Sequence, residues 1–488
     1  MIQLPSLKKN IIYNVIYQLI IVILPLITSP YLSRKLGAEM SGIYAYSYSI
    51  AYYFMMFGRL GITVYGNRSI AKVRDDKEKM SQTFCSLIVF QFVASIIMLV
   101  LYSVYIASSM CSNKVIAILQ TTAIVANMFD ITWFFFGIED FGLALLRNFL
   151  VKVISFFLII IFVNSSRDLW VYTLIMGGST LVGQLVVWPF LKGKVKFAKP
   201  TAQEVMAHFK PNLILFIPSI AISVFQVMDK IMLGVFAPMD EVGFYEYAEK
   251  IISVPKSIIT ALGTAMLPRM SNLIANGQQE KSQKYISLTM YYVNVSASAL
   301  VFGLMGVSSV FAPVYWGENF TECGLLIVCL GPSICFSVIG NVVRTQYIIP
   351  NSKDKEYVTS LVVGAVGNLI GNCIMIPIIG ALGASVSTVI AELVMTGIQL
   401  YVVRNELPLR EYFMSGYPYY IIGFIMFATL IYLQNKVETS IFGLFMLIMI
   451  GAIIFIGLSI IYFMISKNEM TVGLRKKLLS KYRKENNG

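Results

Sequence analysis

Apolar runs of about 20 residues follow one another along almost the whole chain, separated by short polar segments. A run of that length crosses the hydrocarbon core of a bilayer as one helix. The pattern therefore predicts an all-α polytopic membrane protein with about 14 transmembrane helices. The predicted spans are residues 11–33, 40–62, 82–107, 115–137, 144–164 and 168–191 in the first half, and 212–236, 242–266, 286–311, 322–348, 356–378, 380–403, 417–434 and 439–466 in the second.

Two short patterns recur along the chain and predict an internal repeat. Residues 42–46 (GIYAY) match residues 243–247 (GFYEY), and residues 179–186 parallel residues 387–394. Six spans is an even number, so both copies would begin on the same side of the membrane and form two parallel six-helix bundles plus two C-terminal helices. The predicted domains are a first bundle (1–191), a basic cytoplasmic linker (192–211), a second bundle (212–403), two additional spans (404–466) and a basic cytoplasmic tail (467–488).

Composition and charge agree with this topology. The chain is 57% hydrophobic and only 13% charged, which excludes an ordinary soluble domain. Most of its Lys and Arg residues fall on loops that share a side with the N-terminus, and basic loops are retained in the cytoplasm, so both termini are expected there. The opposite side carries Arg34, Lys35, Lys114, Arg167 and Lys436. The net charge of +13 is spread over many short loops, which indicates contact with anionic lipid and no nucleic-acid partner.

Charged residues inside the predicted spans are the main functional signal. On the span at 242–266, Glu246, Glu249, Lys250 and Lys256 recur at helical spacings and form one polar stripe. An ionised side chain at mid-bilayer costs at least ~3 kcal/mol, so this stripe must line a protein interior or a watery cavity. The candidate substrate-binding residues are Arg34, Arg59, Lys152, Lys230, Glu246, Glu249, Lys250 and Lys256.

A structural interpretation stands beside each functional one. Lys256 lies near the centre of its span and binds substrate or forms an ion pair, and Glu246 and Lys250 could neutralise each other. Arg59 is close enough to the inner surface to snorkel, and Arg34 is either a phosphate ligand or an interfacial anchor.

Three intramembrane acids, Asp130, Asp229 and Glu392, are candidates for binding a coupling proton or sodium ion. Glu392 has the neutral Gln184 as its counterpart in the repeat, although a hydrogen-bonded, protonated Glu392 is the structural alternative. The six cysteines lack metal-ligand spacing and are expected to be buried apolar residues, so we predict no metal site and no cofactor. His208, the one histidine, is expected to be a solvated loop residue without a catalytic role.

Several short motifs resemble a known family of membrane proteins. Residues 31–38 (YLSRKLGA), 42–50 (GIYAYSYSI) and 65–68 (YGNR) resemble the N-terminal signature of the bacterial polysaccharide repeat-unit (Wzx-type) flippases. Residues 228–234 (MDKIMLG) and 267–269 (LPR) are similar to that family's pattern in the second half. This family belongs to the superfamily that also holds the multidrug exporters and the peptidoglycan-precursor flippases.

The resemblance implies a flippase that moves polyprenyl-pyrophosphate-linked oligosaccharide from the inner to the outer leaflet of the bacterial cytoplasmic membrane, for O-antigen, capsule or exopolysaccharide synthesis. It also implies a polysaccharide polymerase and chain-length machinery as partners. The intramembrane lysines favour an anionic substrate over the cations of a multidrug exporter, which is the nearest alternative. A membrane-embedded polysaccharide polymerase or ligase is the alternative from another class, and the short predicted outer loops hold no histidine for it.

Overall fold

The computed structural model describes residues 7–466, 471–473 and 475, and within them it describes no side chain of residues 7–23, 141 and 262. Most of the predicted tail at 467–488 therefore lies outside the described residues. The chain divides into two compact units, Met1–Gly243 and Phe244–Gly488, and the division falls inside one helix, α11. The domain boundaries that we derived from the repeat stay predictions.

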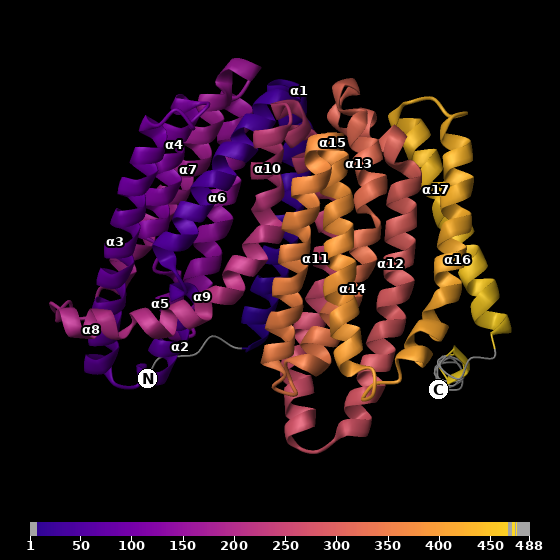
Figure 1. The fold of residues 1–488 in the computed structure, drawn as a ribbon. Helices are drawn as coiled ribbons and strands as arrows, with labels where there is room; N and C mark the ends of the chain where they lie inside the picture. Colours follow the sequence, from indigo (N-terminus) through magenta and orange to yellow (C-terminus); the bar gives the residue numbers. More distant parts are fainter. Residues whose placement is uncertain (1–6, 467–470, 474, 476–488) are drawn as a thin grey trace. The chain divides into compact units, whose positions relative to one another are not determined.

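All regular secondary structure in the described part of the chain is helical, and this part contains no β-strand (Figure 1). The elements up to the dividing helix are α1 (Leu7–Arg59), α2 (Ile62–Val73), α3 (Lys77–Ala107), α4 (Lys114–Met128), α5 (Thr132–Gly137), α6 (Phe141–Phe162), η1 (Ser166–Asp168), α7 (Leu169–Val187), η2 (Trp188–Leu191), α8 (Ala202–Ala207), α9 (Phe209–Ser223), the π-helix η3 (Val224–Met228), α10 (Asp229–Phe236) and α11 (Met239–Ala275). The remaining elements are α12 (Gln279–Trp316), η4 (Glu318–Phe320), α13 (Glu322–Leu330), α14 (Pro332–Val343), the π-helix η5 (Arg344–Ile348), α15 (Asp354–Val403), α16 (Leu409–Gln434) and α17 (Ile441–Ile465).

The predicted class, an all-α polytopic membrane protein, is confirmed. Ten helical stretches of the described residues are long and apolar enough to cross a membrane, or eleven if the bent pair Glu318–Leu330 and Pro332–Ile348 is one span. These ten do not include α1, and they count α15 once. The number fourteen therefore stays a prediction.

The two longest helices are each broken where the sequence predicts the end of one span and the start of the next. With 53 and 50 residues, α1 and α15 would each be more than 70 Å long if straight, over twice the ~30 Å of hydrocarbon. In α1 the break is at Gly37, whose φ of 79° is accessible to glycine at little cost. In α15 it is at Ile379 and Gly380, two residues after Pro377, which cannot donate a helical hydrogen bond.

In the first unit, α3, α4, α6 and α7 run side by side (Figure 1), and small residues let the helices approach closely. Gly177 of α7 faces Thr122 of α4, and a Cβ atom there would lie 2.0 Å from the Thr122 hydroxyl oxygen. A cluster of aromatic side chains, with Phe84, Trp133 and Phe134 fully buried, packs α2, α3 and α5 together. This packing fixes the connection between α4 and α5, where the candidate site begins.

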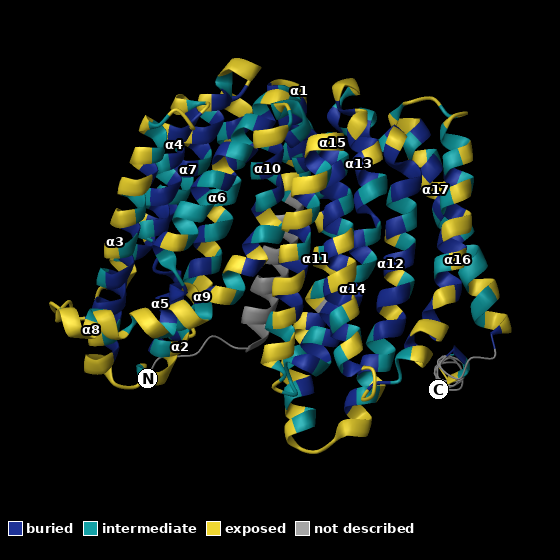
Figure 2. Ribbon diagram, in the orientation of Figure 1, coloured by how far each residue is buried: buried dark blue, intermediate teal, exposed yellow. Residues whose placement is uncertain are grey.

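In the second unit, α16 and α17 pack against α12. Gly306 of α12 meets Leu430 of α16, and Gly423 of α16 meets Phe302 of α12. Leu447 and Phe455 are among the few buried residues of α17. The rest of this helix is largely exposed or half-buried (Figure 2). The two additional spans thus pack mainly against α12.

Candidate functional site

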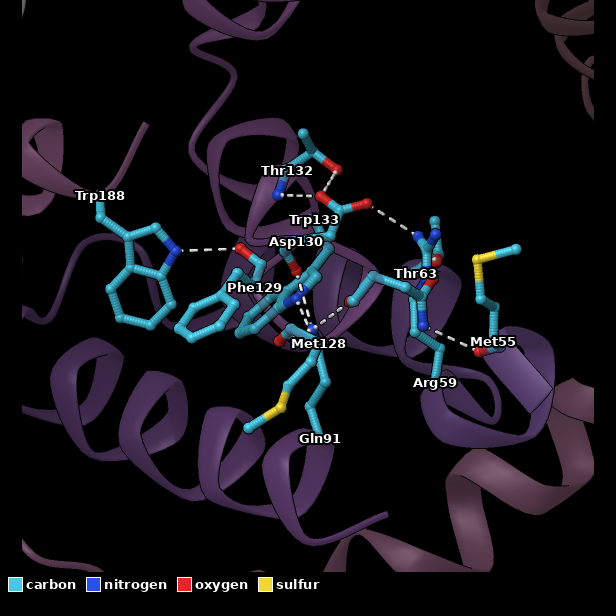
Figure 3. Close-up of polar contacts among 11 residues, drawn as sticks. Met55, Arg59, Thr63, Gln91, Met128, Phe129, Asp130, Thr132, Trp133 and Trp188 are labelled. Carbon is cyan, nitrogen blue, oxygen red and sulfur yellow. Dashed lines mark hydrogen bonds and ion pairs between the residues drawn. The ribbon is translucent and has the colours of Figure 1, made fainter. Parts of the chain in front are cut away.

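The last residue of α1 forms an ion pair with the segment between α4 and α5. The Arg59 guanidinium nitrogen Nη1 lies 2.8 Å from Oδ2 of Asp130 (Figure 3). The other oxygen of Asp130, Oδ1, accepts hydrogen bonds from the backbone N–H of Thr132 at 3.0 Å and from its hydroxyl at 2.6 Å. The Asp130 carboxylate therefore accepts hydrogen bonds from the first residue of α5 and pairs with arginine at the same time.

Asn127, near the end of α4, adds a second link to α1. Arg59 Nε donates a hydrogen bond to Asn127 Oδ1, and Asn127 Nδ2 donates one to the backbone oxygen of Met55 at 2.9 Å. Both polar atoms of the Asn127 side chain are therefore hydrogen-bonded to α1. This arrangement holds the guanidinium in one position, whereas an interfacial arginine would snorkel freely.

At the break between α4 and α5, the backbone carbonyl groups of three residues lie close to one side chain, Gln91 of α3. Its Nε2 lies 3.3, 2.9 and 3.0 Å from the carbonyl oxygens of Asn127, Met128 and Asp130, and its Oε1 accepts from Trp133 Nε1 at 3.0 Å (Figure 3). Gln91 is fully buried. Inside a membrane such groups must be paired within the protein, so Gln91 supports the conformation that positions Asp130.

A polar cavity of about 410 Å³ opens beside Asp130 within the first unit. Two cationic side chains from α6, Arg147 and Lys152, line it together with Gln184 of α7. Its other lining residues are Leu24, Pro25, Thr28, Thr132, Phe136, Asn148, Val151, Ser155, Phe156, Ile159, Met176, Ser179 and Thr180. The lining offers cationic, hydroxyl and amide groups, which are the groups that bind phosphate and sugar.

Lys152 is the notable member of this cavity. It stands at the middle of α6, about 15 Å from either end of the helix at 1.5 Å per residue. It forms no hydrogen bond and no ion pair with any residue that the structure describes. The Gln184 side-chain oxygen is likewise buried without a hydrogen-bond partner in the described part of the chain. An ammonium group in such a place can accept an anion without first giving up a carboxylate.

A smaller cavity of about 270 Å³ lies on Arg59 and Asn127 within the same unit. Tyr48 and Tyr52 of α1 and Ser219 of α9 also line it. The two members of the Arg59–Asp130 pair therefore line different cavities. Arg59 lines this smaller cavity, and Asp130 lines the larger, polar one.

In the second unit the structure joins two residues that we had assigned to different roles. Lys256 Nζ of α11 lies 3.2 Å from Oε1 of Glu392 of α15, and both side chains are largely buried. The other oxygen of Glu392 has no hydrogen-bond partner among the described residues. The ion-pair alternative for Lys256 is therefore present in this conformation, and its role in binding stays a prediction.

Glu246 and Lys250 of α11 form an ion pair of 2.8 Å, as the alternative interpretation of this pair predicts. The Lys250 ammonium also lies 5.4 Å from the centre of the Tyr247 ring. Glu249 is half-buried on the same helix. The stripe is thus partly neutralised by its own charges.

The remaining candidates are Asp229, Lys230 and Arg34. Asp229 begins α10 and is 2% exposed, and the adjacent Lys230 is half-buried. Arg34 is exposed near the break in α1, does not line the polar cavity, and its Nη1 lies 3.4 Å from the Pro30 carbonyl oxygen. Their proposed roles stay predictions.

Sequence reasoning missed Arg147 and Gln91. Arg147 lies inside the predicted span 144–164, so the charge pattern that singled out Lys152 also marks it. Gln91 lies among apolar residues and carries no charge, and only the tertiary contacts reveal its function.

Two expectations are corrected. His208 is half-buried, because its Nδ1 lies 3.0 Å from the Tyr65 hydroxyl and its Nε2 lies 2.8 Å from the Ser86 hydroxyl. It joins the start of α9 to α2 and α3, and is not a solvated loop residue. Cys373 is exposed and not buried, since it lies on the outward face of α15.

Comparison with known proteins adds independent information. The model of the family described as polysaccharide biosynthesis protein matches residues 7–274. The putative O-antigen transporter of Escherichia coli K12 is 24% identical over 406 residues, 82% of this chain and 97% of the relative. Among solved structures, the lipid II flippase MurJ superposes with a TM-score of 0.71 over 93% of this chain and 99% of its own, at 17% identity. A multidrug-resistance transporter of the MATE family reaches 0.56 over 84% of this chain and 98% of its own, at 13% identity. These two likenesses show the fold.

Proposed function

Because this chain belongs to the polysaccharide biosynthesis protein family, we propose that it is a flippase for lipid-linked oligosaccharide. The substrate is an oligosaccharide repeat unit on polyprenyl pyrophosphate, which the protein moves from the inner to the outer leaflet of the bacterial cytoplasmic membrane by alternating access. Both termini face the cytoplasm. The product then passes to a polysaccharide polymerase and its chain-length machinery, for O-antigen, capsule or exopolysaccharide. Similarity to an O-antigen transporter and to the fold of a lipid II flippase supports this proposal.

The observation that carries the proposal is the Lys152 ammonium group in the polar cavity. A cation at mid-membrane without a carboxylate partner is costly, and such residues mark substrate or ion pathways. The diphosphate of the substrate provides the missing negative charge, and the hydroxyl groups of Ser155, Ser179 and Thr180 provide partners for sugar. Arg147 adds a second cation on the same wall.

Likeness to the fold of a multidrug transporter supports a second candidate function, the export of amphipathic cations. Such a substrate requires carboxylates in the cavity. The one carboxylate that lines the polar cavity in the described structure belongs to Asp130, and Arg59 already neutralises it. The charge of this cavity therefore favours an anionic substrate.

The test uses purified protein in vesicles that contain a fluorescent polyprenyl-diphosphate-linked oligosaccharide. Lys152→Ala should slow flipping roughly 10- to 100-fold, because a hydrogen bond to a charged group contributes about 1.5–3 kcal/mol. Lys152→Arg should retain more activity than Lys152→Gln, since arginine keeps the charge. The exposed loop residue Lys192 gives the matched control, and Lys192→Ala should behave as wild type.

A second variant tests the sign of the cavity charge. Gln184→Glu places a carboxylate in the cavity of Lys152, at the position where the repeat has Glu392 paired with Lys256. This variant should fold normally and lose flipping, because Lys152 then has an internal partner. The opposite outcome is that wild-type vesicles take up amphipathic cations faster than protein-free vesicles and leave the lipid-linked oligosaccharide unmoved. That result would establish the multidrug-exporter function.

A further inference from the structure

A third hollow, of about 500 Å³, lies between α6 and α7 and is apolar. Its lining consists of aliphatic and aromatic side chains and two glycines, apart from Arg147 and Ser179. Leu150 on α6 is 45% exposed and Val182 on α7 is 60% exposed. Exposed apolar side chains on two membrane-spanning helices face hydrocarbon, so this groove is open to the interior of the bilayer.

The groove and the polar cavity share one wall. Arg147, Val151 and Ser179 line both hollows. On α6 the shared residues are four apart and form a stripe, with Lys152 on the cavity side and Leu150 on the groove side. Arg147, only 9% exposed, is thus a buried cation between an apolar and a polar hollow.

The same wall contains a polar contact between the two helices. The Ser155 hydroxyl of α6 donates a hydrogen bond of 2.7 Å to the Ser179 hydroxyl of α7. Gly178, the residue before Ser179, has no atom within 4 Å of the position that a Cβ would take. The groove therefore continues over the backbone of Gly178. Small hydroxyl groups can exchange hydrogen-bond partners without repacking, which makes this seam a suitable place for a molecule to pass between hollows.

The chemistry of a lipid-linked diphosphate fits this juxtaposition. During crossing its head group is at mid-membrane, while its isoprenoid chain must remain in hydrocarbon, so the path needs an apolar opening beside a cationic cavity. An ordinary phospholipid keeps its phosphate at the interface, about 15 Å from Lys152, and makes no use of a cation at that depth.

We propose that the groove between α6 and α7 holds the polyprenyl chain of the substrate while the diphosphate contacts Arg147 and Lys152. The gap between α6 and α7 is then a lateral opening. It lets the polyprenyl chain stay in the bilayer while the head group, still attached to it, lies in the polar cavity. This inference rests on the proposed function for the identity of the ligand, and it adds the location of the chain.

The experiment places a photoreactive benzoylphenylalanine at Leu150 or at Val182, one at a time, in the full-length protein. Vesicles contain radiolabelled undecaprenyl diphosphate as the probe, with an excess of either unlabelled undecaprenyl diphosphate or phosphatidylglycerol. Ile453 and Ile456 of α17, which are also exposed, apolar and outside the groove, give the matched control positions. We expect labelling at the groove positions and not at the controls, and competition by unlabelled undecaprenyl diphosphate alone.

Equal labelling of groove and α17 positions, or equal competition by phosphatidylglycerol, would mean that the groove holds bulk lipid and would overturn the inference. Gly178→Leu fills the groove and should lower the labelling yield at Val182 roughly tenfold. Loss of the contacts of about two methylene groups of the polyprenyl chain would weaken its binding by that factor. Gly457→Leu, at another open glycine on α17, should leave the yield unchanged. Labelling needs no transport, so groove labelling in a protein that does not flip would refute the proposed function alone, and flipping without groove labelling would refute this inference alone.

Discussion

Asp130 and Arg59 place opposite charges in contact inside membrane-spanning segments, with 8% and 30% of their side chains exposed. Removing one partner leaves the other charge unpaired in a medium that solvates it poorly. We therefore expect Asp130→Ala to lower the free energy of unfolding by about 3 kcal/mol, at the low end of the range for buried pairs because Arg59 is partly exposed. Thermal unfolding of the detergent-solubilised protein measures this.

The matched variant removes both charges. Arg59→Met combined with Asp130→Leu should unfold at a higher temperature than Asp130→Ala, because no unpaired charge remains. If Asp130→Ala is as stable as wild type but flips without its ion dependence, then Asp130 is an ion-coupling residue, as the sequence alone suggested.

Individual charged residues could be identified from the sequence, and so could the pair of Glu246 and Lys250 within one helix, but the partners that come from other helices could not. Lys152 and Glu392 stand out because a charge inside an apolar run needs a reason. The contact between Lys256 and Glu392 joins residues 136 positions apart, and nothing in the local sequence encodes it. Gln91 is a stronger example, since an uncharged amide acquires its role only where a helix break presents three carbonyl groups to it.

At the scale of elements, hydropathy predicts where helices lie but not where they are interrupted within a span. The breaks in α1 and α15 coincide with predicted ends of spans, where Gly37 and Gly380 supply the required backbone conformation. The break between α4 and α5 lies inside the predicted span 115–137, and the π-helices η3 and η5 lie within the spans 212–236 and 322–348. These interruptions depend on tertiary hydrogen bonds, which replace those of a regular helix.

Two adjacent glycines of α7 provide a matched test of helix packing. Gly177 touches Thr122 of α4, whereas Gly178 faces open space. Gly177→Leu should separate α4 from α7 and lower the free energy of unfolding by roughly 1–3 kcal/mol, the usual cost of overpacking. Gly178→Leu should leave the unfolding temperature near that of wild type. Equal destabilisation by both substitutions would indicate that helix propensity or lipid contact decides, and not the approach of α4.

For the whole molecule, the internal repeat stays a prediction, and one observation bears on it. The offset that maps Gly42 onto Gly243 also maps the break at Gly37 onto Pro238, which lies between α10 and α11. The chain divides into two units of nearly equal length, but their boundary between Gly243 and Phe244 does not coincide with the predicted ends of the bundles at 191 and 212. In the predicted repeat, Gln184 of the polar cavity corresponds to Glu392 of the second unit, so the two halves would differ in charge at this position.

The orientation in the membrane rests on the distribution of Lys and Arg, and cysteine labelling measures it. Single cysteines at Ser165, Asn319 and Asn435 of a cysteine-free variant should react with an impermeant thiol reagent from outside intact cells. Those at Asp76 and Gln279 should react only after permeabilisation. All five positions are exposed, so access does not limit the reaction. The reverse pattern would place the termini outside, and labelling of all five would refute the predicted alternation of spans.

Net movement of a lipid-linked oligosaccharide to the outer leaflet requires either consumption of the product or coupling to an ion gradient, and Glu392 is suited to coupling. Its Oε1 pairs with Lys256, and its Oε2 has no partner among the described residues. Protonation of this carboxylate, or binding of sodium, would weaken the pair and release the Lys256 ammonium group for the diphosphate. Ion binding and substrate binding would then be coupled at one ion pair, because the ion frees Lys256 for the diphosphate. Asp229, buried at the start of α10, is the second candidate.

We therefore expect Glu392→Gln or Asp229→Asn to abolish the dependence of flipping on an imposed proton or sodium gradient in reconstituted vesicles, while some flipping down the concentration gradient of the substrate remains. Lys353→Gln is the matched control, because Lys353 pairs with Glu406 on a loop outside the spans, and it should leave the gradient dependence intact. If wild-type vesicles flip at one rate whether both gradients are imposed or collapsed, no ion drives transport. Glu392 is then a structural partner of Lys256, and removal of the product must supply the direction.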